Sequence, residues 1–121
     1  MSDFVEYLYE VFSPLGTIKA RKIFGGYGIY HDDLMFGLVA DDIWYLKADA
    51  ENSSFFTDVG LQAFEYAKQG KIHQLSYYTA PEALFDDSDL ATIWARCSLA
   101  AALRTKIKNA RKWKPTPPKS N

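Results

Sequence analysis

The sequence predicts an α+β fold, in which helices cover an antiparallel β-sheet. Short apolar segments joined by two-residue turns fill residues 17–47, and a second pair of such segments spans residues 63–79. Apolar residues at helical spacing mark both ends of the chain. Strands joined this tightly pair antiparallel, because parallel pairing needs a long crossover connection. We therefore expect a meander plus a hairpin, flanked by an N-terminal helix, a short middle helix and a long C-terminal helix.

The N-terminal half holds the first helix and four of the strands. Apolar residues at helical spacing place the helix at Asp3–Phe12, and Pro14 with Gly16 ends it. The four strands are expected at Thr17–Phe24, Tyr27–His31, Leu34–Ala40 and Ile43–Lys47. The pairs Asp32-Asp33 and Asp41-Asp42 separate the last three strands and fit two-residue hairpin turns.

The second half begins with a short helix at Asp49–Val59, which is expected to bury Phe55, Phe56 and Val59. A second hairpin follows at Ala63–Ala67 and Ile72–Thr79. The acidic residues 86–89 offer N-caps for a final helix that reaches about Lys112. The apolar face of this helix is expected at Leu90, Ile93, Trp94, Cys97, Ala101, Leu103 and Ile107.

Composition fits one domain with a buried core. The chain has 121 residues, of which 48% are hydrophobic, and no apolar run approaches the roughly 20 residues of a membrane-spanning helix. The acidic start lacks the basic region of a secretory signal, and Cys97, the one cysteine, suits a reducing compartment. The prolines after Lys114 cannot continue a helix. We predict a cytoplasmic protein with one domain over residues 1–112 and a disordered Pro/Lys-rich tail over residues 113–121.

The two signs of charge are segregated along the chain. Residues 1–95 hold all 15 acidic side chains and six of the 14 basic ones, for a net charge of −9, whereas residues 96–121 hold eight basic and no acidic side chains. Such an asymmetry indicates nucleic acid or an acidic surface as a partner. Two other interpretations remain open: bases at a helix C-terminus oppose the macrodipole, and a basic tail can fold back on an acidic body.

Few residues are candidates for catalysis or metal binding. The two histidines, His31 and His73, lie on predicted strands, and Cys97 lies on a predicted apolar helix face. They offer neither a nucleophile with its base nor the four spaced ligands of a structural zinc site. We expect no enzymatic activity, no metal and no cofactor.

The glycines Gly25, Gly26 and Gly28 lead into a strand, whereas a phosphate-binding loop opens a helix. They predict a structural turn or bulge, where a positive φ or a close backbone approach requires glycine. The alternative is a flexible platform beside Arg21 and Lys22 that meets a phosphate or the backbone of a partner.

Several motifs carry a family resemblance over about residues 4–103. They are Arg21-Lys22-Ile23-Phe24-Gly25-Gly26-Tyr27-Gly28-Ile29-Tyr30, Met35-Phe36, Tyr45-Leu46-Lys47-Ala48-Asp49, Ser76-Tyr77-Tyr78 with Pro81, and Trp94-Ala95-Arg96. In these residues the chain resembles the N-terminal domain of the TfoX/Sxy competence regulators. The resemblance implies an α+β sandwich-like unit similar to secretion-chaperone-type folds. It also implies a role in natural transformation beside a transcription factor or polymerase, with the cyclic-AMP receptor protein as the partner of full-length members.

We therefore predict a non-enzymatic regulatory or interaction module linked to transcription. The candidate contacts are the basic residues Arg21, Lys22, Arg104, Lys108, Arg111 and Lys112. Such bases would bind phosphates without reading sequence, so non-specific DNA contact is open and a protein partner is expected to do the reading. Three alternatives remain open: a protein-binding adaptor, a homodimer formed through the aromatic sheet face or the long helix, and a small-molecule sensor with a pocket between sheet and helices.

Overall fold

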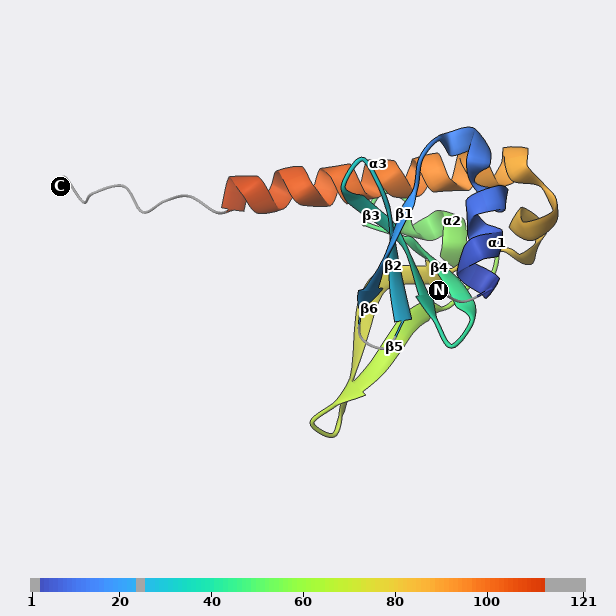
Figure 1. Cartoon of the computed structure of the whole chain (residues 1–121). Helices are drawn as coiled ribbons and strands as arrows, with labels where there is room; N and C mark the ends of the chain where they lie inside the picture. The colour runs from blue at the N-terminus through green and yellow to red at the C-terminus, as the bar shows by residue number, and fades with distance from the viewer. Residues whose placement is uncertain (1–2, 24–25, 113–121) are drawn as a thin grey trace.

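The computed structural model describes residues 3–23 and 26–112 and confirms the α+β class (Figure 1). The elements are α1 (Asp3–Val11), the short 3-10 helix η1 (Ser13–Leu15), β1 (Lys19–Ile23), β2 (Gly26–His31), β3 (Leu34–Ala40), β4 (Ile43–Lys47), α2 (Ser53–Thr57), β5 (Ala63–Lys68), β6 (Lys71–Thr79), the 3-10 helix η2 (Glu82–Asp86) and α3 (Ser88–Lys112). The predicted tail at residues 113–121 lies outside the described residues. None of the helices described has the length and apolar character needed to span a bilayer.

The predicted meander and hairpin join into one six-stranded antiparallel sheet, in the order β1-β2-β3-β4-β6-β5. The two parts meet where β4 pairs with β6, with Tyr45 opposite Thr79. The predicted Asp-Asp turns are confirmed: all four aspartates have φ between 50° and 63°. Two consecutive residues with positive φ match the right-handed twist of the strands they connect, and aspartate tolerates this conformation better than most residues.

Aromatic rings fill the core between the helices and the sheet. The ring of Phe12 lies 5.7 Å from that of Phe36 and 5.4 Å from that of Trp44, between ring centres. Gly37 makes this packing feasible, because a Cβ at that position would lie 1.8 Å from an atom of the Trp44 ring. The core thus depends on one glycine in the middle of a central strand.

The middle helix is shorter than predicted, and its expected apolar face is wrong. α2 has one buried aromatic residue, Phe56, whose ring stacks on that of Tyr78 at 5.3 Å. Phe55 and Val59 are 53% and 64% exposed. Residues 49–52 form a hydrogen-bonded turn instead of a first helical turn, and five helical residues can direct only one large side chain into the core.

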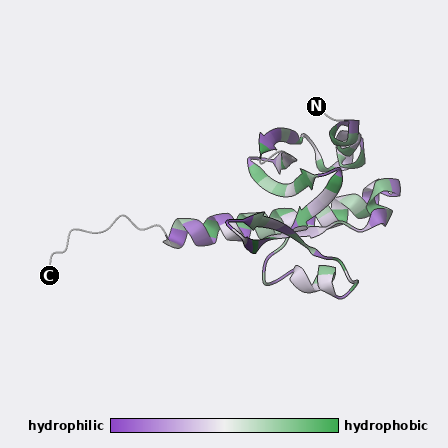
Figure 2. Ribbon diagram, turned by 90° about the horizontal axis from the view of Figure 1, so that it is seen from below, coloured by the Kyte–Doolittle hydropathy of each residue, from purple (hydrophilic) through white to green (hydrophobic). Residues whose placement is uncertain are grey.

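The final helix reaches Lys112 as predicted, but the prediction for its buried face is wrong at three of the seven residues. The buried residues of α3 are small: Ala91, Thr92, Ala95, Ser98, Ala101 and Ala102. Leu90, Trp94 and Leu99 pack against the core and are partly buried. Ile93, Leu103 and Ile107 are 60%, 47% and 44% exposed. Small side chains let α3 lie close to β3 and β4, so the larger residues at the same helical spacing face outward. Figures 1 and 2 show the last turns of α3 extending beyond the sheet.

Candidate functional site

The segment that follows β4 forms a polar turn attached to α3. The carboxylate of Asp49 accepts hydrogen bonds from the backbone N–H groups of Glu51 and Asn52, at 3.0 and 3.1 Å. Asn52 is 3% exposed, and its amide donates to the carbonyls of Lys47 and Cys97, at 3.3 and 3.4 Å. An aspartate or asparagine that bonds to backbone groups a few residues away stabilises such turns. Residues 47–52 are therefore held to both β4 and α3.

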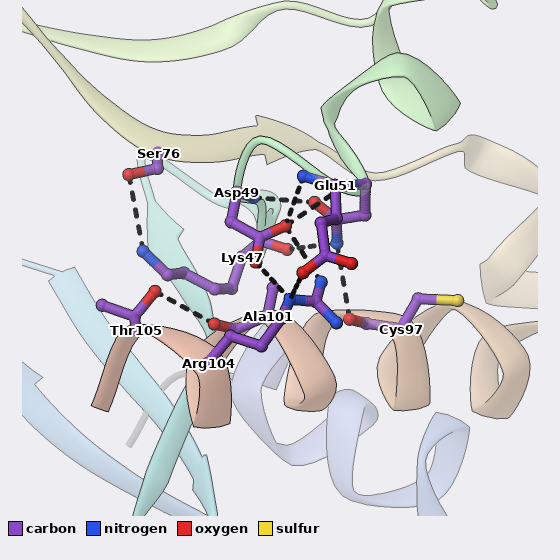
Figure 3. A network of polar contacts seen from close by, with 9 residues as sticks. Lys47, Asp49, Glu51, Ser76, Cys97, Ala101, Arg104 and Thr105 are labelled. Atoms are coloured by element: carbon purple, nitrogen blue, oxygen red, sulfur yellow. Dashed lines mark hydrogen bonds and ion pairs between the residues drawn. The ribbon is translucent and has the colours of Figure 1, made fainter. Parts of the chain in front are cut away.

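Arg104 binds two carboxylates of this turn (Figure 3). Its Nε and Nη2 atoms donate to Asp49 at 2.5 and 2.9 Å, and Nε also lies 2.9 Å from Glu51. The hydrogen bond from Arg104 is the main cause that lowers the pKa of Asp49, and the same bond raises the pKa of Arg104. The fork geometry of a guanidinium matches a carboxylate, which makes such pairs stronger than single hydrogen bonds.

Lys47 lies beside this network and points toward Ser76, whose Oγ accepts from its amine at 3.4 Å (Figure 3). The amine also lies 5.2 Å from the centre of the Tyr77 ring. Burial lowers the pKa of Lys47, and the nearby Asp49 opposes that shift. An open hollow of about 390 Å³ lies here, lined by residues that include Lys47, Ser76, Arg104, Thr105, Lys108 and Asn109. Asp49 and Glu51 also line it, so this surface carries both basic and acidic side chains. Across residues 3–23 and 26–112, no group of three or more His, Cys, Asp or Glu side chains could hold a metal ion.

The remaining predicted bases of α3 lie on its projecting end. We use "basic end" for Arg104, Lys108, Arg111 and Lys112. Arg104, Lys108 and Arg111 line one shallow groove of about 500 Å³ together with Ile107. Lys108 and Arg111 are exposed, and within the described part of the chain no carboxylate forms an ion pair with either. Lys112 is the last residue of the helix, and its side chain is outside the described structure.

Arg21 and Lys22 lie on the edge strand β1, and the helix end projects away from the sheet (Figure 1). The guanidinium of Arg21 lies 4.8 Å from the centre of the Tyr30 ring and 3.7 Å from the carboxylate of Asp33. Both Arg21 and Lys22 are exposed. The five predicted contact residues whose side chains are described therefore lie on two separate elements, Arg21 and Lys22 on β1 and the other three on α3.

The described glycines of the motif lie within β2 rather than in the turn before it. A Cβ on Gly26 would lie 2.1 Å from the carbonyl oxygen of Val39 on the neighbouring strand. A Cβ on Gly28 would lie 3.0 Å from the sulfur of Met35 and from the ring of Tyr30. Close packing between β2 and β3 therefore explains why position 26 requires a glycine, and no positive φ is involved. Gly25 is outside the described residues.

Residues 10–102 match the family model of the TfoX N-terminal domain. The chain belongs to this family. DNA transformation protein TfoX1 of Aliivibrio fischeri (strain ATCC 700601 / ES114) is 30% identical over 82 residues, which cover 68% of this chain and 39% of the relative. Protein Sxy of Escherichia coli (strain K12) is 32% identical over 97 residues, which cover 80% of this chain and 46% of the relative. The chain thus matches less than half of the length of either relative.

Within this TfoX N-terminal domain, the family match includes the turn at residues 47–52 and ends two residues before Arg104. The contact of Arg104 with Asp49 therefore joins the matched region to the basic end. In the sequence, Lys47 and Asp49 stand out only as part of a motif, and nothing there indicates a role for them. No local signal could have shown the pairing, because Asp49 and Arg104 are 55 residues apart in the chain.

Proposed function

We propose that this TfoX N-terminal domain is a non-enzymatic regulatory module of DNA transformation, and that it acts by contacting another macromolecule through the basic end of α3. The name of one relative, DNA transformation protein TfoX1, supports a role in this process. One structural observation supports the surface: Lys108 and Arg111 are exposed on a projecting helix end, and the structure described pairs neither with a carboxylate. On this proposal the domain works in the cytoplasm.

Arg104 has a different task from the other residues of the basic end. Two carboxylates already neutralise its guanidinium, so it has little positive charge to offer a partner. It fixes the base of the projecting helix to the turn at residues 47–52, which holds Lys108 and Arg111 in a defined direction. Arg104 is thus a positioning residue, while Lys108 and Arg111 make the contact.

The partner that fits this surface is an acidic patch of a DNA-reading protein, such as a transcription factor or polymerase. Lysine and arginine contacts to phosphates set position and carry no sequence information. A regulator must act at chosen promoters, so the chain needs a partner that selects the DNA. The apolar Ile107, which lines the same groove as Lys108 and Arg111, adds a contact that a protein surface can use better than a phosphate backbone. Arg21 and Lys22 form the secondary contact surface of this proposal.

Charge reversal with a matched control tests the proposal. K108E/R111E alters the basic end, and K68E/K71E makes the same change of charge at the exposed turn of the β5–β6 hairpin. The tagged full chain and both variants are used to capture partners from a native lysate of the source organism, with quantitative mass spectrometry. We expect a DNA-binding regulator or polymerase subunit to be captured by the wild type and by K68E/K71E, and to fall at least tenfold with K108E/R111E. Equal capture by all three proteins would overturn the proposal for this surface.

A further inference from the structure

We infer that α3 pairs antiparallel with α3 of a second copy of this chain, through an exposed apolar stripe centred on Ala100. The stripe consists of Ile93, Cys97, Ala100, Leu103 and Ile107. The proposal goes beyond the proposed function, because it concerns contacts between two copies of the chain. Both contacts use Ile107, Lys108 and Arg111, so one basic end binds either a second copy or the partner, and not both at once.

The fold itself makes no use of this stripe. α3 packs its small residues on the sheet and leaves Ile93, Leu103 and Ile107 as large apolar side chains in solvent. Ala100 is exposed between them, and Cys97 is half-buried. A helix that is apolar on two opposite faces is expected to bury both, and the sheet covers only one.

The spacing of the stripe is that of a helix-pairing surface. Ile93, Ala100 and Ile107 are seven residues apart, with Cys97 and Leu103 between them, and the exposed Arg96 interrupts this face one turn after Ile93. A seven-residue apolar repeat keeps one seam facing a neighbouring helix along its whole length. From Ile93 to Ile107 the seam is about 21 Å long, at 1.5 Å per residue.

An antiparallel register pairs the stripe with itself. With Ala100 facing Ala100 of the second copy, Ile93 lies level with Ile107 and Cys97 lies level with Leu103. The small alanine at the centre allows the two helices to approach closely. Every apolar residue of the stripe then has an apolar neighbour at its own height.

Charge selects this direction over a parallel pair. One turn before Ile93 the stripe carries Asp89, and one turn after Ile107 it carries Arg111. The antiparallel register places Asp89 level with Arg111 of the second copy at both ends. A parallel pair in register would place each Arg111 beside the other, and like charges repel. Antiparallel helix dipoles favour the same direction.

A hollow beside the stripe adds to the fit. Phe55, Asp58, Ile93, Trp94 and Cys97 line an open space of about 430 Å³ between α2 and α3, and Phe55 is largely exposed. In the antiparallel pair, Ile107 of the second copy meets this hollow beside Ile93. Lys108 of the second copy comes to the side of α3 on which Asp58 lies, so an acidic residue meets a basic one. A second copy therefore matches this surface in shape and in charge.

Disulfide trapping tests the direction and the register together. In a C97S background, A100C places a thiol on the two-fold axis, whereas A110C places one on the same helix about ten residues further on. In the antiparallel pair two A110C thiols are separated by about 30 Å along the helix axis. We expect mild oxidation of the purified full chain to give a covalent dimer with A100C and not with A110C. Equal dimer yields from both variants, or none from A100C, would overturn the proposal.

Light scattering of the purified chain tests the contact without any cross-link. The wild type should elute as a dimer at tens of micromolar, and L103K/I107K should weaken the dimer at least tenfold. I72K is the matched control, because Ile72 is an exposed isoleucine of β6 outside the stripe. Circular dichroism checks that each variant is folded. A monomeric wild type, or an equal effect of I72K, contradicts the proposal. No partner is present in either test, so their results are independent of the proposed function.

Discussion

Arg104 donates two hydrogen bonds to Asp49 across 55 residues of sequence, and this pair anchors the projecting end of α3 to the turn that follows β4. The pair lies at the boundary between the packed part of the helix and the part that extends beyond the sheet. Its effects on stability, on pH dependence and on contacts of the basic end can each be measured separately.

Replacing Arg104 by methionine is expected to destabilise the fold. R104M keeps the aliphatic packing of the side chain and removes two charge-assisted hydrogen bonds, each of which is worth somewhat more than a neutral one. Because the guanidinium is partly solvated, we expect a loss of about 1 kcal/mol in the free energy of unfolding, measured by urea denaturation. K106M, on the same helix in an exposed position, is the control and should change stability little. Equal losses in the two variants would contradict the role of the pair.

The stabilising effect of the pair should disappear in acid. The pKa of Asp49 is lowered in the folded protein, so its carboxylate contributes stability above its unfolded pKa of about 4, and that contribution is lost as pH falls through the folded pKa. The difference in unfolding free energy between wild type and R104M should therefore be largest near pH 7 and shrink below pH 4. Urea titrations at several pH values measure it. A difference that stays constant down to pH 3 would exclude Asp49 as the source.

An alanine at position 37 should damage the core. Its Cβ would occupy space within 1.8 to 2.6 Å of three atoms of the Trp44 ring, so the ring must move. Overpacking of this kind costs roughly 1–3 kcal/mol, and we expect G37A to fall at the upper end. G28A is the comparison, because the nearest atoms there, the sulfur of Met35 and a ring carbon of Tyr30, lie at 3.0 Å rather than 1.8 Å. Thermal unfolding of both variants measures the effect, and a G37A protein as stable as G28A would contradict the packing described.

Direct DNA contact, if the basic end makes one, should depend on salt and not on sequence. Each phosphate neutralised contributes a slope of about −0.9 to log K against log salt concentration. Fluorescence anisotropy with two unrelated duplexes should give equal affinities, and K108E/R111E should reduce the slope by about 2 in magnitude. Unequal affinities for the two duplexes would show sequence readout, which this account does not assign to the chain. An absence of binding at low salt would leave the protein partner as the contact.

Much of the fold can be predicted from short segments of the sequence, because the turns that set the strand order depend on the residues within them. The four aspartates of the two turns adopt positive φ through their own chemistry, and their spacing sets the meander. The side of α3 that packs against the sheet cannot be predicted from local sequence in this way. Both Ala91 with Ala95 and Ile93 with Ile107 have helical spacing, and only the close approach to β3 and β4 decides that the small residues face inward.

The candidate site could be predicted only in part for a related reason. Charge segregation in the sequence indicates Lys108 and Arg111, and both are exposed basic residues in the structure. They lie at the end of a helix, where few neighbouring residues can neutralise them. Charge segregation also indicates Arg104, whose charge the structure neutralises with Asp49 and Glu51. Pairing between residues far apart in the chain leaves no trace in spacing or composition. The contact of Arg104 with Asp49 is therefore visible only in the three-dimensional structure.

Transformation frequency in the source organism is the most direct measure of the central claim, that the basic end of α3 carries a regulatory function in DNA uptake. The chromosomal gene is replaced by K108E/R111E or by K68E/K71E, and immunoblots confirm equal protein levels. The account predicts a loss of at least tenfold in transformants with K108E/R111E and a wild-type frequency with K68E/K71E. Wild-type frequency in both strains would contradict it.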